Sequence, residues 1–212
     1  MLRKSSMLSV ALAAALLLSA PFALAAPTTW LIDPNHSSVE FSIRHLFSKV
    51  PGKFTKFSGT IVYDAANAPA SSVKAEIDAS TITTANEKRD GHLKSEDFFD
   101  VAKYPTLSFE STKVEAAGEN KLKVDGSLTM HGVTKPVTLD VTFLGAGPGM
   151  GGRQVSGFEA IAKVNRKDFN ITWNRNLDQG GTLLGDDVEI HLNVEANTPP
   201  PAEKKTEAGA AK

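Results

Sequence analysis

The chain has 212 residues, of which 41% are hydrophobic and 22% charged, and its 23 Lys and Arg residues nearly balance 24 Asp and Glu residues. This composition is typical of a globular protein of one or two domains and argues against an intrinsically disordered chain. The lack of cysteine excludes a disulfide scaffold, a thiolate nucleophile and an iron–sulfur cluster. The near-neutral charge offers no broad basic surface for nucleic acid.

Both ends of the chain are predicted to lie outside the fold. Residues 1–25 combine Arg3 and Lys4 with an apolar run and the triplet Ala23-Leu24-Ala25, which is typical of a secretory signal peptide. The apolar run is shorter than the about 20 residues of a membrane span, and an uncleaved anchor is the alternative. Residues 197–212, rich in Pro, Ala, Lys and Glu, predict a disordered tail. We therefore expect a periplasmic protein with one folded domain at 26–196.

Residues 26–196 predict one β-strand after another. Apolar and polar residues alternate with the period of two that half-buried strands show. The alternating segments lie at 28–32, 38–45, 57–63, 73–79, 107–109, 122–130, 137–143, 158–164 and 188–194. His131-Gly132 is interpreted as a turn, and the glycine-rich run 145–152 as a hairpin connection. Eight or nine strands separated by turns predict an all-β sandwich or barrel.

One stretch breaks this alternation. Residues 86–103 are highly charged and place Leu93, Phe98, Phe99 and Val101 at near-helical intervals. Because Gly91 interrupts this stretch, we expect one or two short helical pieces there, which pack Phe98 or Phe99 onto the sheet.

The charged side chains admit structural and functional interpretations. Arg44, Arg89 and Arg166 could each bind a phosphate or carboxylate through the guanidinium. For Arg89 and Arg166 we favour structural ion pairs, with Asp90 or Asp168 as partners.

Other polar residues give little sign of a catalytic or metal site. The adjacent carboxylates Asp186 and Asp187 are interpreted as solvated turn charges. The five histidines lack the spacing of a zinc motif, so a zinc site would need ligands from distant parts of the chain. We expect no metal and no catalytic residue.

Several motifs resemble the YceI-like family of secreted lipid-binding proteins. They begin with Trp30-Leu-Ile-Asp33-x-x-His36-Ser37-x-Val39-x-Phe41-x-Ile43-x-His45. The resemblance is strongest in Arg89-Asp90-x-His92-Leu93-x-Ser95-x-Asp97-Phe98-Phe99-Asp100 and in Tyr104-Pro105-x-Leu107-x-Phe109-x-Ser111. It continues through Gly126-x-Leu128-Thr129-x-His131-Gly132 and Arg166-x-Asp168-Phe169 in the same order. The glycine-rich run and the C-terminal tail depart from the family pattern.

The resemblance implies an extended, lipocalin-like antiparallel β-barrel of about eight strands around an apolar tunnel. It also implies a long-chain amphiphile as ligand, such as a polyisoprenoid, an isoprenoid quinone or a fatty-acid-like lipid, with no other cofactor. The side chains expected to line the tunnel are Phe41, Ile43, Phe57, Ile61, Leu107, Phe109, Leu128, Leu139, Val141, Phe158 and Trp173. Arg44 and His45 are the candidate contacts of the lipid head group. Alternation reports a strand's face but not which face borders a hollow, so ordinary core remains the alternative for each lining residue.

The sequence is also compatible with two other functions. A hydrolase could act on a lipid ester or phosphate at the barrel mouth, with His45 or His92 as the residue to test. An interaction module could instead capture a partner through residues 197–212. Transient membrane contact and a homodimer are both compatible with the lipid-binding hypothesis.

Overall fold

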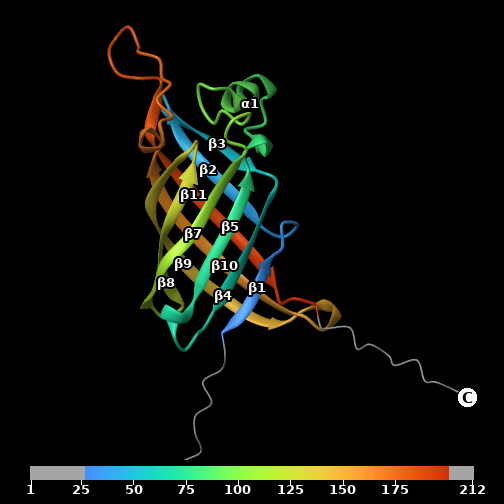
Figure 1. The fold of residues 1–212 in the computed structure, drawn as a ribbon. Helices are drawn as coiled ribbons and strands as arrows, with labels where there is room; N and C mark the ends of the chain where they lie inside the picture. Colours follow the sequence, from blue (N-terminus) through green and yellow to red (C-terminus); the bar gives the residue numbers. More distant parts are fainter. Residues whose placement is uncertain (1–26, 201–212) are drawn as a thin grey trace, which may run out of the picture.

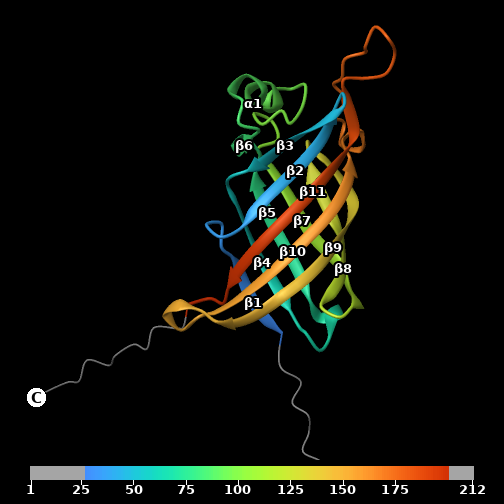
Figure 2. The same ribbon diagram turned by 180° about the vertical axis from the view of Figure 1, so that it is seen from behind.

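The computed structural model describes residues 27–200, and these form one closed antiparallel barrel (Figures 1 and 2). The strands are β1 (Thr28–Ile32), β2 (Ser38–His45), β3 (Ser48–Phe54), β4 (Phe57–Tyr63), β5 (Ser72–Asp78), β6 (Ile82–Thr83), β7 (Thr106–Gly118), β8 (Lys121–Met130), β9 (Val133–Pro148), β10 (Gln154–Asn165) and β11 (Leu184–Asn197). The helix α1 spans Glu87–Lys94, and four short 3-10 turns lie at Ala68–Ala70, Ala79–Thr81, Met150–Gly152 and Arg166–Phe169. The all-β barrel prediction is confirmed for this part of the chain.

Eight strands close the barrel in the order β1-β4-β5-β7-β8-β9-β10-β11, and β11 pairs again with β1. The β1–β11 seam is short, because only Leu31 with Asn197 and Ile32 with Ala196 lie in register. Earlier on β11, at residues 184–193, β2 pairs with it and carries β3 and β6 as an extension of the sheet. Full closure leaves most strands without a free edge.

The helix α1 packs at one end of the barrel, beside β3 and β6 (Figures 1 and 2). Asn86 caps it by accepting the Arg89 backbone N–H at 3.0 Å. The predicted interruption at Gly91 is wrong, since α1 runs through this residue. A glycine inside a helix costs only about 0.5–1 kcal/mol relative to alanine. Phe98, in the turns after α1, is buried in the core, and the ring of Phe99 packs edge-on against Phe54 at 5.7 Å.

Two further boundaries differ from the sequence-based expectation. The glycine-rich run is not wholly a connection, because β9 continues to Pro148 and only residues 149–153 turn. At the C-terminal side, Asn197 still belongs to β11, and the Thr198 backbone N–H donates to the Gln154 carbonyl at 3.0 Å. The predicted signal peptide lies outside the described residues, and so does the part of the predicted tail beyond residue 200. No helix in the range 27–200 has the length and apolar character needed to cross a bilayer.

Candidate functional site

The interior of the barrel is hollow. A cavity of about 410 Å³ extends between the strands, within the 300–1,000 Å³ range typical of ligand pockets. It is bordered almost entirely by apolar side chains. All eleven residues expected to line the tunnel border this cavity, namely Phe41, Ile43, Phe57, Ile61, Leu107, Phe109, Leu128, Leu139, Val141, Phe158 and Trp173. That these side chains contact a ligand remains a prediction.

Strand alternation explains how the sequence builds this wall. On β5, Val73, Ala75 and Ile77 point into the cavity, while Lys74 and Glu76 lie between them on the opposite face. Lys74 forms an ion pair on the outside of the barrel with Glu110 of β7, with 2.6 Å between Nζ and Oε1. Because successive side chains point to opposite faces, one strand supplies both the apolar wall and the charged outer surface.

A glycine opposite an aromatic ring keeps part of the cavity open. Phe41 on β2 lies directly across from Gly52 on β3, and its ring covers that glycine. A Cβ atom at Gly52 would lie only 2.3 Å from Cζ of Phe41, and all its nearest contacts are atoms of this ring. The ring lies flat against the wall because no side chain stands beneath it.

Substituting Gly52→Ala is therefore expected to push the Phe41 ring into the cavity. Affinity for a long-chain lipid should fall, by roughly 10-fold or more if about 1.4 kcal/mol of contact is lost. Lipid titration of the purified variant measures this effect, and the double variant Gly52→Ala/Phe41→Leu should recover much of the affinity. An unchanged affinity in Gly52→Ala would show that the ring position does not control the cavity.

Polar side chains border the cavity at several places, among them Ser71 and Ser72 before and at the start of β5, but its two histidines and Arg89 lie toward α1. His45, Thr84, Arg89 and His92 border the cavity there. The two residues proposed to contact the head group lie on opposite faces of β2. His45 borders the cavity, whereas Arg44 lies on the outer face beside Lys49 and Asp186. Its guanidinium Nη1 donates to the Leu46 carbonyl at 3.1 Å. The structure thus does not bring Arg44 to the cavity, because it alternates with the inward-pointing Ile43 and His45.

Arg89 occupies a position that the sequence analysis interpreted differently. Its Nε donates to Oγ1 of Thr84 at 2.6 Å and its Nη2 to the Thr84 carbonyl at 2.8 Å. Within residues 27–200 no carboxylate lies within 4.0 Å of its guanidinium nitrogens, so the expected ion pair with Asp90 is wrong. The Asp90 carboxylate instead accepts from Thr83 and Thr84. Arg89 is a cation with neutral partners at the end of an apolar cavity.

An aromatic cluster adjoins Arg89. The His92 ring packs edge-on against Phe98 at 5.0 Å and against Trp173 at 4.9 Å, measured between ring centroids. His92 Nε2 also lies 2.7 Å from Oδ2 of Asp97, which orients the imidazole. Sequence reasoning placed Arg89 and His92 in a charged helical segment but gave no signal that this segment faces the cavity.

Comparison with known proteins identifies the family. The family model of the YceI-like domain matches residues 30–196. The chain belongs to the YceI-like family. A UPF0312 protein of Vibrio cholerae serotype O1 is 41% identical over 171 residues, which cover 79% of this chain and 89% of the relative. A UPF0312 protein of Pseudomonas syringae pv. tomato is also 41% identical, over 79% of this chain and 88% of the relative.

Solved structures share this YceI-like fold. Burkholderia cenocepacia BcnA superposes with a TM-score of 0.68 at 26% identity, over 77% of this chain and 98% of that protein. The YCEI protein of Campylobacter jejuni gives 0.64 at 34% identity, over 74% and 90%. A polyisoprenoid binding domain from Saccharophagus degradans gives 0.59 at 18% identity, over 81% and 99%, and this likeness shows the fold alone.

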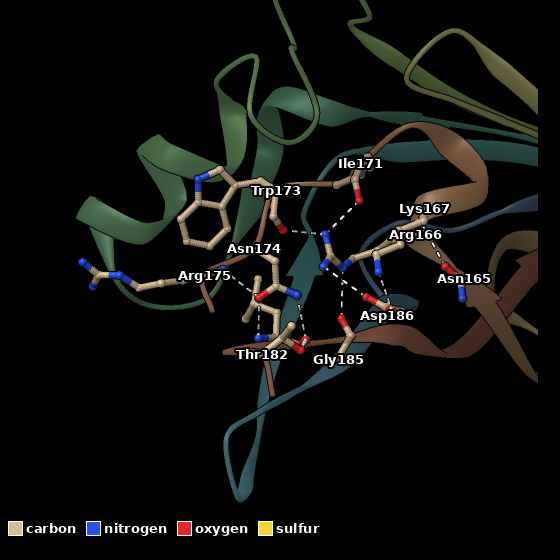
Figure 3. Close-up of polar contacts among 11 residues, drawn as sticks. Asn165, Arg166, Lys167, Ile171, Trp173, Asn174, Arg175, Thr182, Gly185 and Asp186 are labelled. Atoms are coloured by element: carbon tan, nitrogen blue, oxygen red, sulfur yellow. Dashed lines mark hydrogen bonds and ion pairs between the residues drawn. The ribbon is translucent and has the colours of Figure 1, made fainter. Parts of the chain in front are cut away.

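A buried arginine anchors the segment that carries Trp173 in this YceI-like barrel (Figure 3). Arg166, only 3% exposed, donates from Nη1 to the carbonyls of Ile171 at 2.8 Å and Trp173 at 2.7 Å, and from Nε to that of Gly185 at 3.0 Å. Its Nη2 lies 3.3 Å from Oδ1 of Asp186. The guanidinium therefore joins the loop at 171–173 to the start of β11.

Two sequence-based interpretations are corrected by this cluster. The carboxylate partner of Arg166 is Asp186 and not Asp168, because β11 lies beside β10 in the sheet. Asp186 is not a free turn charge either, since its Oδ2 also accepts from Lys167 Nζ at 2.8 Å. The hydrogen bond from Lys167, assisted by the charges of Lys167 and Arg166, lowers the pKa of Asp186 below its usual 3.8.

This lowered pKa gives the YceI-like barrel an acid-dependent contribution to stability. A carboxyl whose pKa is lower when folded stabilises the fold above its unfolded value, and the contribution disappears as the pH falls through the folded value. We expect Asp186→Asn to destabilise the protein at pH 6 and the penalty to be smaller at pH 3, as measured by urea unfolding at each pH. A penalty that is equal at both pH values would contradict this linkage.

Proposed function

We propose that this protein binds one long-chain amphiphilic lipid inside the barrel, with its hydrocarbon chain in the apolar cavity. The observation that carries the proposal is the cavity of about 410 Å³, whose wall is almost entirely apolar. A polyisoprenoid, an isoprenoid quinone or a fatty-acid-like lipid fits this description. The polyisoprenoid binding domain of Saccharophagus degradans, which shares the fold, agrees with the proposal.

The free energy of chain burial is sufficient for stable binding. Each buried CH₂ group contributes about 0.8 kcal/mol, so a chain of about twenty carbons offers roughly 16 kcal/mol before costs. Lost freedom of motion and ordering of the chain offset several kcal/mol of this gain. Micromolar or tighter affinity follows without any strong polar contact.

The polar lining supports one orientation for the ligand. Arg89 and His92 lie at the α1 end together with His45, and each can donate a hydrogen bond to an oxygen of a head group. At the opposite end Tyr63, Phe143 and Phe158 form an aromatic cluster with centroid separations of 4.7–5.7 Å. The ligand would place its head near α1 and its tail toward this cluster.

The cellular role is also part of the proposal. A signal peptide at residues 1–25 would deliver the protein to the periplasm, where a lipid-filled barrel could carry, store or protect its ligand. Binding rather than catalysis is the activity that an apolar cavity supports directly. Exchange of the ligand would require transient contact with a membrane.

Native mass spectrometry of the secreted protein tests the proposal. We expect a copurified lipid whose mass identifies its class, and we expect the delipidated protein to rebind it. Ligand at 100 times its Kd should stabilise the fold by about 2.7 kcal/mol, seen as a higher unfolding temperature. A delipidated protein that neither rebinds isoprenoids or fatty acids nor gains stability would refute lipid binding. Ester or phosphate turnover abolished by His92→Ala would favour the hydrolase instead.

A further inference from the structure

Three potential metal ligands meet at the β1–β11 seam, on the outside of the barrel. Asp33 follows β1, His36 lies in the turn before β2, and Glu195 belongs to β11. His36 Nδ1 lies 3.0 Å from Asp33 Oδ2 and 3.6 Å from Glu195 Oε1. One ligand atom from each residue can be chosen so that all three lie within 4.8 Å of one another. Imidazole nitrogen and carboxylate oxygen form a donor set suited to zinc and related divalent ions.

The distances between these atoms suit a tetrahedral ion. Zinc bonds to nitrogen and carboxylate oxygen are about 2.0–2.2 Å long, so neighbouring ligand atoms around a tetrahedral centre lie about 3.3–3.6 Å apart. The two separations at His36 differ from this range by no more than a few tenths of an ångström. The ligand atoms of Asp33 and Glu195 lie within 4.8 Å of each other, so rotation of the two carboxylate side chains would bring this third pair to the same spacing, and the fourth position would face solvent.

The backbone that carries these side chains is held by the seam. The Asp33 N–H donates to the Glu195 carbonyl at 2.9 Å. Ser37 Oγ donates to the same carbonyl at 3.1 Å and accepts from the Glu195 N–H at 3.0 Å. Asp33 is further oriented by the Asn35 N–H on Oδ1 and by Asn197 Nδ2 on Oδ2. Outer partners of this kind fix a ligating carboxylate and strengthen metal binding.

We propose that Asp33, His36 and Glu195 form a binding site for a divalent transition-metal ion, of which zinc is the best representative. The ion would join the β1–β2 turn to β11 at the place where only two residue pairs close the barrel. Because metal bound to the native state stabilises it, occupancy would strengthen the seam. The site lies on the outer surface of the barrel and is independent of the lipid in the cavity.

Titration of the metal-free mature protein with Zn²⁺ alone tests the site. We expect one saturable site by calorimetry and a rise in unfolding temperature at saturating Zn²⁺. His36→Gln should weaken binding by about 100-fold or more, and Glu195→Gln by about 10-fold or more, because each removes a ligand. His191→Gln is the matched control, since this exposed histidine also lies on β11 but outside the cluster.

Two outcomes would overturn the proposal. One is an absence of saturable Zn²⁺ binding by the parent protein at concentrations up to about 100 μM, which corresponds to a binding free energy weaker than about 5.5 kcal/mol. The other is binding that His36→Gln leaves intact or that His191→Gln removes to the same extent. Circular dichroism of each variant checks that the barrel is folded, which we expect because His36 is largely exposed.

Discussion

Replacing Arg166 by Met should lower the free energy of unfolding by about 3–5 kcal/mol. The substitution removes the donor to the carbonyls of Ile171, Trp173 and Gly185 and leaves these acceptors without their partner (Figure 3). It also deprives Asp186 of its buried cation. Urea unfolding followed by circular dichroism measures the loss. The effect is large because an unpaired buried polar group costs more than the net value of the bond that it made.

Arg175→Met is the matched control for this experiment. Arg175 lies nine residues further along the same loop, and Figure 3 shows its side chain directed away from the Arg166 cluster. Removing an exposed charge of this kind should change the stability by no more than about 0.5 kcal/mol. Comparable losses in the two variants would show that the carbonyl contacts of Arg166 do not anchor the loop. Arg166→Lys should recover little, because an ammonium cannot reproduce the forked geometry.

Filling the cavity should strongly weaken lipid binding while the barrel still folds. Ala75 of β5 points into the cavity, so Ala75→Trp would place an indole in the space proposed for the lipid chain. We expect affinity for a long-chain isoprenoid or fatty acid to fall about 100-fold or more, equivalent to about 2.7 kcal/mol or more. Fluorescence or calorimetric titration of delipidated protein measures the change, and native mass spectrometry should show the copurified lipid reduced.

Glu76→Trp separates loss of space from a general effect of a bulky residue. Glu76 is the next residue on the same strand, and its side chain is on the outer face. This variant adds the same indole to solvent and should bind lipid as the parent does. Ala75→Trp should lower the free energy of unfolding by about 1–3 kcal/mol, the usual cost of an overpacked interior. Lipid affinity that survives Ala75→Trp would mean that the chain binds elsewhere.

Local sequence patterns indicated the apolar face of most strands of the barrel. Alternation placed Phe41 and Ile43 on the apolar face of β2, and Val73 and Ile77 on that of β5, before any fold was known. A buried apolar face fixes the strand register, because a slip by one residue would turn that whole face toward solvent. His131-Gly132 was likewise predictable as a turn, and both residues have positive φ in the structure.

The candidate head-group end was predicted less well. Arg44 and His45 are adjacent in the sequence, yet alternation allows only one of them to face the cavity. Arg89 and His92 reach the cavity because the loop around α1 folds back onto the barrel end (Figure 1). That placement depends on long-range packing, of which a helix of eight mostly charged residues carries no sign.

The sequence by itself determined the strand periodicity, the all-β class and the apolar face that became the cavity wall, because these follow from the local geometry of an extended chain. Only the tertiary structure decided that this wall encloses a hollow, that Arg166 pairs with Asp186, and that Glu195 lies beside His36. Each of these depends on barrel closure, which brings residues as far apart as 36 and 195 together. A local pattern records which way a side chain points but not what it meets across the sheet.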